Sequence, residues 1–249
     1  FLKEDRGHLP LERMAEALSG VTFHERLGSM AEKTVRLRAL AEPLAEAWRL
    51  TDEERTHLRR ACQLAKADLV STMVKEFPTL QGVIGKYYAR DSGEPQLVAE
   101  AIEEQYLPAA THAAQAGLPV GDRHPRTLLG SALAILDKYD TLSSYFGLGI
   151  LPTGDQDPFG LRRAAQGIVE IAWTVHRPLP LAALFRTRAS MEPFRSAQPR
   201  AAATAGNEVQ RYLLERLGTF AWPDPAPAPD CIDAVLAGPC EDLVDVMDR

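Results

Sequence analysis

Two aspartates three residues apart, Asp137 and Asp140, lie in the most apolar stretch of the chain, Thr127 to Tyr145. Paired carboxylates on one helix can bind a metal ion or transfer protons. A carboxylate taken out of water also needs a cationic or hydrogen-bonding partner. Lys66, Lys138 or an arginine of the next helix would supply that partner. We therefore expect ion pairs here rather than a catalytic dyad.

The usual signatures of a catalytic centre are missing from the sequence. Its six histidines show no pairing at helical spacing, and its three cysteines lack the spacing of zinc ligands. It contains no GxxxxGK[ST] phosphate loop, no GxGxxG motif and no GxSxG nucleophile elbow. These observations exclude nucleotide binding by those loops. The odd cysteine count argues against a secreted disulfide framework and favours the cytoplasm.

Arg162 and Arg163 are the first candidates for contact with RNA. They follow Asp157-Pro158, a pair that predicts a helix start with Asp157 as its N-cap. Free N–H groups, the helix dipole and two guanidinium groups would suit phosphate oxygens. In the alternative, one arginine pairs internally with Asp155 or Asp137, and the other is solvated.

A second basic set comes from two successive predicted helices. Arg55 and Arg59 are four residues apart and share a helix face, so they could follow an RNA backbone. The alternative is a solvated face balanced by neighbouring glutamates. The full set is Lys33, Arg36, Arg38, Arg55, Arg59 and Arg60, and the glutamates are Glu32, Glu53 and Glu54.

Tyr87 and Tyr88 could stack on an RNA base. Their helical spacing from Leu80 and Val83 instead predicts that one of the two belongs to the core.

Helices must position all of these residues, because Ala, Leu, Glu and Arg abound, aromatic residues are sparse, and no convincing alternating strand occurs. Thr51 and Glu54 form a predicted capping box. The helical ranges that we expect are 9–19, 21–48, 51–74, 80–89, 96–106, 127–145, 159–175, 213–217 and 232–248. Loops are expected at 117–125 and 147–158, a mobile connection at 191–206, and a stiff proline spacer at 223–229. The expected fold is all-α, with a linker helix at 1–20, a compact body at 21–190 and a looser segment at 191–249.

Four groups of sequence strings together resemble the β subunit of the bacterial two-subunit glycyl-tRNA synthetase, in its HD-like domain. They are FHERLGS at 23–29, AKADLV and MVKEFP at 65–78, EEQYLP and LDKYDTL at 103–142, and PTGDQDPFGLRR at 152–163. DAVLA at 233–237 also resembles the segment that leads toward the anticodon-binding domain of that family. The chain would then be an internal piece of that subunit.

The resemblance implies a degenerate HD-domain-like helical bundle. Where an HD enzyme carries its His-Asp pair, this chain reads Leu64-Ala65-Lys66-Ala67-Asp68, and the first histidine position falls near Lys33. The distal aspartate corresponds to Asp137. Since a protonated lysine is a poor metal ligand, we expect a scaffold without metal, with Asp68 in a structural role. The alternative is a working metal-dependent phosphohydrolase of the HD type.

The resemblance also implies the partners. These are tRNA(Gly), the synthetase α subunit and other β-subunit domains, in the cytoplasm. No cofactor is expected in this piece, because ATP and Mg²⁺ would be bound by the α subunit, which holds the aminoacylation site. A purely structural spacer is the second alternative. One departure stands out: Asp155 and Gln156 replace a serine and a lysine of the family pattern, which makes that loop less cationic.

Overall fold

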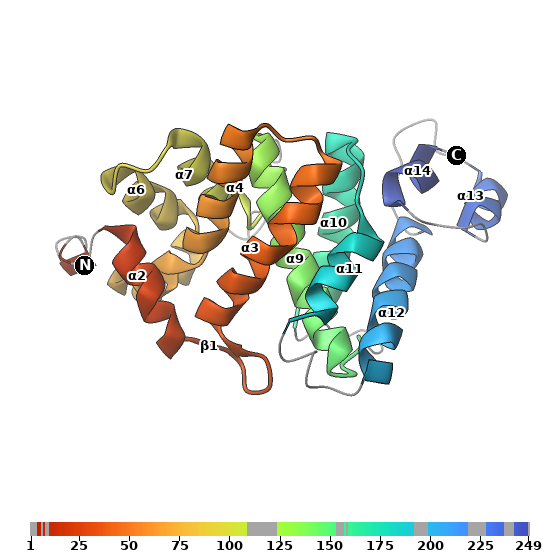
Figure 1. The fold of residues 1–249 in the computed structure, drawn as a ribbon, viewed down its shortest axis with the longest axis horizontal. Helices are drawn as coiled ribbons and strands as arrows, with labels where there is room; N and C mark the ends of the chain where they lie inside the picture. The colour runs from red at the N-terminus through yellow and green to blue at the C-terminus, as the bar shows by residue number, and fades with distance from the viewer. Residues whose placement is uncertain are drawn as a thin grey trace.

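The computed structural model describes residues 4–5, 7, 10–108, 124–152, 157, 159–191, 199–218, 228–236 and 242–248. Helices dominate this part of the chain, as expected (Figure 1). The longer ones are α3 (Met30–Ala47), α4 (Asp52–Leu64), α9 (Leu128–Gly147), α10 (Leu161–Val175) and α12 (Pro199–Gly218). The shorter ones are α2 (Leu11–Ala17), α5 (Thr72–Glu76), α6 (Val83–Asp91), α7 (Gln96–Glu104), α11 (Leu181–Ala189), α13 (Pro229–Leu236) and α14 (Leu243–Asp248).

Helix α9 is the centre of the core. It packs against α3, α4, α7, α10 and α12, and apolar side chains fill most of its circumference. Leu133, Leu136 and Leu142 on this helix are fully buried. Thr127 begins it, because its hydroxyl accepts a hydrogen bond from the Gly130 N–H. The prediction that this helix is central is confirmed.

The all-α prediction is wrong in one place, because residues 22–29 form a small hairpin. Strands β1 (Thr22–His24) and β2 (Gly28–Ser29) pair antiparallel, where the apolar spacing predicted a helix from Val21. Gly28 has a φ of 82°, which a glycine adopts at little cost. Ser29 and Glu32 then form a capping box that starts α3 at Met30. Local turn and cap chemistry thus overrides the helical spacing.

Two other helix predictions change at their ends. The capping box of Thr51 and Glu54 is confirmed, but α4 ends at Leu64, and a 3-10 turn (η2, Ala67–Val70) and α5 follow it. The expected connection at 191–206 is helical from Pro199 onward, and α12 packs against α9 and α10 through Val209 and Leu213. The predicted final helix is two helices, α13 and α14. Most of the expected loop at 117–125 and of the proline spacer lies outside the described residues.

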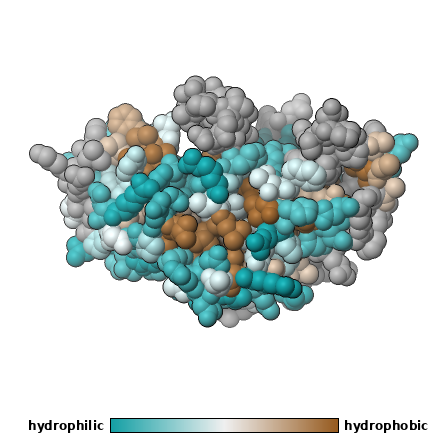
Figure 2. Space-filling view, turned by 90° about the horizontal axis from the view of Figure 1, so that it is seen from above, coloured by the Kyte–Doolittle hydropathy of each residue, from teal (hydrophilic) through white to brown (hydrophobic). Residues whose placement is uncertain are grey.

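Hydrophilic side chains cover much of the described surface in the view from above, around an apolar area near its middle (Figure 2). Within the described ranges, no helix combines the length and the apolar character needed to cross a membrane.

Candidate functional site

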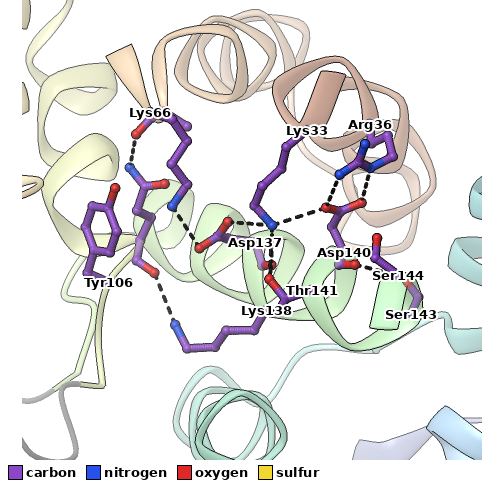
Figure 3. Close-up of polar contacts among 12 residues, drawn as sticks. Lys33, Arg36, Lys66, Tyr106, Asp137, Lys138, Asp140, Thr141, Ser143 and Ser144 are labelled. Atoms are coloured by element: carbon purple, nitrogen blue, oxygen red, sulfur yellow. Dashed lines mark hydrogen bonds and ion pairs between the residues drawn. The ribbon is translucent and has the colours of Figure 1, made fainter. Parts of the chain in front are cut away.

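Side chains from α3 and from the turn after α4 meet the carboxylates of α9 inside the molecule (Figure 3). The Asp137 carboxylate lies between two ammonium groups. Lys33 Nζ is 3.1 Å from Asp137 Oδ1, and Lys66 Nζ is 2.9 Å from Asp137 Oδ2. Both lysines are almost fully buried. Lys33 comes from α3 and Lys66 from the turn after α4, so Asp137 joins both segments to the central helix.

Asp140, one turn further along α9, is fully buried and more heavily paired. Arg36 binds it in a bidentate manner, with Nε at 2.7 Å from Oδ1 and Nη2 at 3.1 Å from Oδ2. Lys33 Nζ lies 3.1 Å from Oδ2, and Nε of the buried Arg188 on α11 lies 3.4 Å from Oδ1. We call the six side chains Lys33, Arg36, Lys66, Asp137, Asp140 and Arg188 the charge network.

The charge network keeps its carboxylates ionised. Burial raises the pKa of Asp140, but the Lys33 ammonium and the Arg36 guanidinium more than offset it and lower that pKa to about 2. The pKa of Asp137 is likewise lowered, because Lys33 and Lys66 outweigh its burial. Carboxylates that hold no proton at neutral pH and are saturated with cations cannot act as general acids, and they have little capacity left for a metal ion.

The expected ion pairs of Asp137 and Asp140 are therefore confirmed, with Lys66 among the partners. The arginines are Arg36 of α3 and Arg188 of α11, where one from the next helix, α10, was expected. Lys138 has a different role, since its Nζ donates to the backbone oxygens of Gln105 at 3.1 Å and Leu107 at 2.6 Å. Burial lowers the pKa of Lys138 to about 8. Lys138 thereby ties α9 to the end of the α7 segment.

The positions at which the resemblance expects a degenerate metal site are packed with other groups. Ala65 and Ala67 are fully buried apolar residues. Asp68 Oδ2 accepts a hydrogen bond from the Gly82 N–H at 2.6 Å, and burial raises the pKa of Asp68. Within the described ranges, no group of three or more His, Cys, Asp and Glu side chains is arranged to hold a metal ion.

The second basic set does not form one surface. Lys33 and Arg36 are buried in the charge network, so the prediction that they line an RNA-facing surface is wrong for this fold. Arg55 donates from Nε to the Leu50 backbone oxygen at 3.0 Å. Arg59 is exposed, but both its Nε and its Nη2 bind the Glu42 carboxylate. The structure favours the balanced-face alternative for Arg59, with Glu42 as its partner.

The start of α10 is more open. The helix begins at Leu161, later than predicted, and Pro158, Asp155 and Gln156 lie outside the described residues. Asp157 Oδ1 and Oδ2 accept the backbone N–H groups of Arg162 and Arg163 at 3.2 and 3.4 Å. The N–H groups expected to meet phosphate are therefore already bonded to Asp157. The side chains of the two arginines are therefore the groups to consider for an anion.

The two arginine side chains differ. The Arg163 side chain is 52% exposed, and its Nε lies 3.6 Å from Asp157 Oδ2. Arg162 is half-buried and lies close to Tyr212 of α12. Burial raises the pKa of Tyr212, and the Arg162 guanidinium offsets part of that rise. Asp157 is thus the internal partner of Arg163, where Asp155 or Asp137 was expected. Arg163 is the better placed of the two to reach a ligand.

Of the two tyrosines proposed to stack a base, Tyr88 is buried and donates its hydroxyl to Asp5 Oδ2 at 2.7 Å. Tyr87 is 55% exposed. The prediction that one of them belongs to the core is confirmed.

Sequence reasoning missed a cluster of aromatic rings beside Arg163. We call Phe23, His24, Tyr145 and Phe159 the aromatic cluster. Phe159 stacks on Tyr145 with ring centroids 4.6 Å apart, and His24 meets Tyr145 edge to face at 5.5 Å. Phe23 contacts the same tyrosine at 5.9 Å. Three of the four residues lie in strings that carry the resemblance, which was the available signal.

The family model and the relatives that this chain matches carry the same description. A family model described as glycyl-tRNA synthetase beta subunit matches residues 1–237. The glycine–tRNA ligase beta subunit of Trichodesmium erythraeum is 40% identical over 257 residues, which cover 100% of this chain and 34% of that protein. The Halothermothrix orenii protein of the same name is 41% identical over 220 residues, covering 88% of this chain and 30% of the relative. For the Bacillus subtilis protein the identity is 42% over 171 residues, with coverages of 69% and 24%.

This chain spans about a third of the length of the first of these relatives. The family match covers nearly all of it, including both the charge network and the aromatic cluster. The chain therefore belongs to the glycyl-tRNA synthetase β-subunit family.

Proposed function

We propose that this part of the β subunit is a non-catalytic body that helps to hold tRNA(Gly) while glycine is attached on the α subunit. In this proposal the partners are tRNA(Gly), the α subunit and other β-subunit domains, in the cytoplasm. ATP and Mg²⁺ belong to the α subunit. The names of the relatives, each a glycine–tRNA ligase beta subunit, support the assignment of substrate.

The observation that carries the RNA-binding role is the position of Arg163. Its guanidinium is half exposed at the start of α10 and lies close to Gly160, the residue that follows the exposed Phe159. A guanidinium group donates several hydrogen bonds in one plane, which suits a phosphate. Asp157 pairs with it only at 3.6 Å and at the surface, where such pairs contribute little. A phosphate would compete with that pair at small cost.

We further propose that the bundle is a degenerate HD-like scaffold, in which ammonium groups replace a metal ion beside Asp137. Lys33 and Lys66 neutralise that carboxylate from two sides, as a cation would. This supports a scaffold over the alternative of an HD-type phosphohydrolase. The three-part division at residues 20 and 190 remains a prediction.

A purely structural spacer is the second candidate, and the charge network favours it. The network joins α3, the turn after α4, α9 and α11 through buried ion pairs, so the body is well held together. A spacer requires this rigidity, and its function does not depend on an exposed arginine.

Measurements of tRNA binding by the full assembly of α and β subunits distinguish the two candidate functions. Arg163→Ala should weaken tRNA(Gly) binding more than twofold, and should reduce the slope of log affinity against log salt by about one. Arg162→Ala should have the smaller effect, because Arg162 is half-buried near Tyr212. Arg59→Ala is the matched control, an exposed arginine paired with Glu42 on the α4 surface. Unchanged binding in all three variants would favour the spacer.

A further inference from the structure

We propose that the aromatic cluster is a stacking platform for one unpaired base of a bound RNA, with Phe159 as the ring that meets the base. This inference rests on the proposed RNA-binding role and adds the chemical class of what is bound. The ligand is a single-stranded nucleotide rather than a base-paired stem. The argument starts from an exposed ring whose other side is already packed.

Phe159 is 43% exposed, although it belongs to a stack of rings. Its ring lies nearly parallel to Tyr145, with an angle of 30° between the planes. Tyr145 is itself buried on the C-terminal half of α9, so the platform rests on the central helix. His24 from the hairpin approaches both rings, at 5.5 Å from Tyr145 and 6.5 Å from Phe159. Two separate segments, α9 and the hairpin, therefore hold Phe159 in place.

A rigid ring with an exposed side suits a nucleobase. Bases in single strands stack on aromatic side chains, whereas paired bases in a stem are already stacked on their neighbours. A ring that is held before binding loses little conformational entropy when the base arrives. The aromatic cluster provides an exposed ring fixed by its neighbours, which is the arrangement that base stacking needs.

Arg163 offers a group for a phosphate close to Phe159 along the chain. The guanidinium of Arg163 folds back over Gly160, where an added Cβ would lie only 3.2 Å from Arg163 Nη2. Gly160 has a φ of 68°, and so it allows this close approach. Phe159 and Arg163 are thus near enough for one nucleotide to use both, with its base on the ring and its phosphate on the guanidinium.

Contacts with the charge network hold the aromatic cluster in place. Lys33 Nζ lies 4.8 Å from the centroid of Phe23, and the Arg36 guanidinium carbon lies 5.5 Å from it. Both are members of the charge network on α3, so cation–π contacts fix the hairpin to α3, and the ion pairs of the same two cations join α3 to α9. The aromatic cluster and the charge network are therefore in direct contact through Phe23.

The test uses tRNA(Gly) binding by the assembled full-length α and β subunits. Phe159→Ala should weaken binding about tenfold, since a stacked base contributes roughly that factor or more. The slope of affinity against salt should not change, because no phosphate contact is lost. Phe159→Trp and Phe159→Tyr should bind within twofold of the unsubstituted protein. Phe159→Leu should behave like Phe159→Ala, because leucine is apolar but has no π face.

Phe77→Ala provides the matched control, since Phe77 is an exposed aromatic residue at the end of α5. Its binding should be unchanged. Full binding by Phe159→Ala would overturn the stacking proposal, and so would full binding by Phe159→Leu. Loss of the α–β assembly in Phe159→Ala, seen by size-exclusion chromatography, would also overturn it, because the ring would then contact protein. If Arg163→Ala still weakens binding while Phe159→Ala does not, the proposed function stands and only the platform fails.

Discussion

Asp140 is the residue on which most of the buried charge converges. Its two carboxylate oxygens face Lys33, Arg36 and Arg188, and it has no exposed surface. Taking so many charges out of water is costly, and only their mutual pairing offsets that cost. Without Asp140, Arg36 and Arg188 would lose the carboxylate that they share, and Lys33 would keep only that of Asp137.

Asp140→Asn should therefore lower the free energy of unfolding by about 3 to 5 kcal/mol. Urea denaturation followed by circular dichroism would measure this. Glu42→Gln is the control, because it breaks a surface pair with Arg59 and should cost about 1 kcal/mol or less. Equal effects in the two variants would contradict the central role of Asp140.

The same residue predicts a dependence on pH. The pKa of Asp140 is about 2 in the folded protein, against about 3.9 in an unfolded chain. Its contribution to stability is fully present above pH 4, and is lost as the pH falls through about 4 towards 2. Unfolding free energy should fall in this range, and less steeply in Asp140→Asn than in the unsubstituted protein. Parallel pH profiles would count against the prediction.

At the scale of elements, the packing of α6 on its neighbours depends on a glycine. A Cβ on Gly85 would lie 2.8 Å from Ile102 Cγ2 and 3.1 Å from the Asp68 carboxyl carbon. Gly85→Ala should therefore destabilise the fold by about 1 to 3 kcal/mol, even though alanine favours a helix. Gly20→Ala should be nearly neutral, since nothing lies within 4 Å of its added Cβ. Thermal unfolding of both variants would measure the difference.

The elements also show how far the sequence could predict this structure. Caps and apolar spacing predicted α4 and α9, as Thr51 and the apolar side chains of α9 show. They did not predict α12, because residues 199–206 were expected to form a mobile connection. The hairpin at 22–29 was not predicted, because Phe23 and Leu27 fit a helical spacing while the turn depends on the backbone of Gly28. Spacing alone cannot reveal a turn of that kind.

The candidate site was predicted less completely, because its contacts join distant parts of the chain. The ion pairs of Asp137 and Asp140 were expected, but the burial of Lys33 and Arg36 was not. Their partner Asp140 is more than a hundred residues away, at separations of 107 and 104. A local pattern of cations looks the same whether it is solvated or paired with a distant carboxylate. Phe159 was missed for a similar reason, since Tyr145 and His24 meet it only in the fold.

At the scale of the whole molecule, the proposed scaffold predicts that this part of the β subunit needs no transition metal. Protein purified without chelators should hold no stoichiometric Mn, Fe, Co, Ni or Zn by mass spectrometry, because ammonium groups occupy both sides of Asp137. Chelation should leave the thermal midpoint unchanged. Stoichiometric metal together with phosphatase turnover would instead support the HD-type hydrolase.

The long sequence separation within the charge network has a consequence for synthesis on the ribosome. Helix α3 emerges before α9, and Asp140 follows 104 residues after Arg36. At usual rates of translation this delay lasts about 5 to 20 s. Throughout it, Lys33 and Arg36 lack their carboxylate and stay hydrated, which keeps that side of the nascent helix polar. The same two cations that end up inside the molecule would then help to keep the unfinished chain from aggregating.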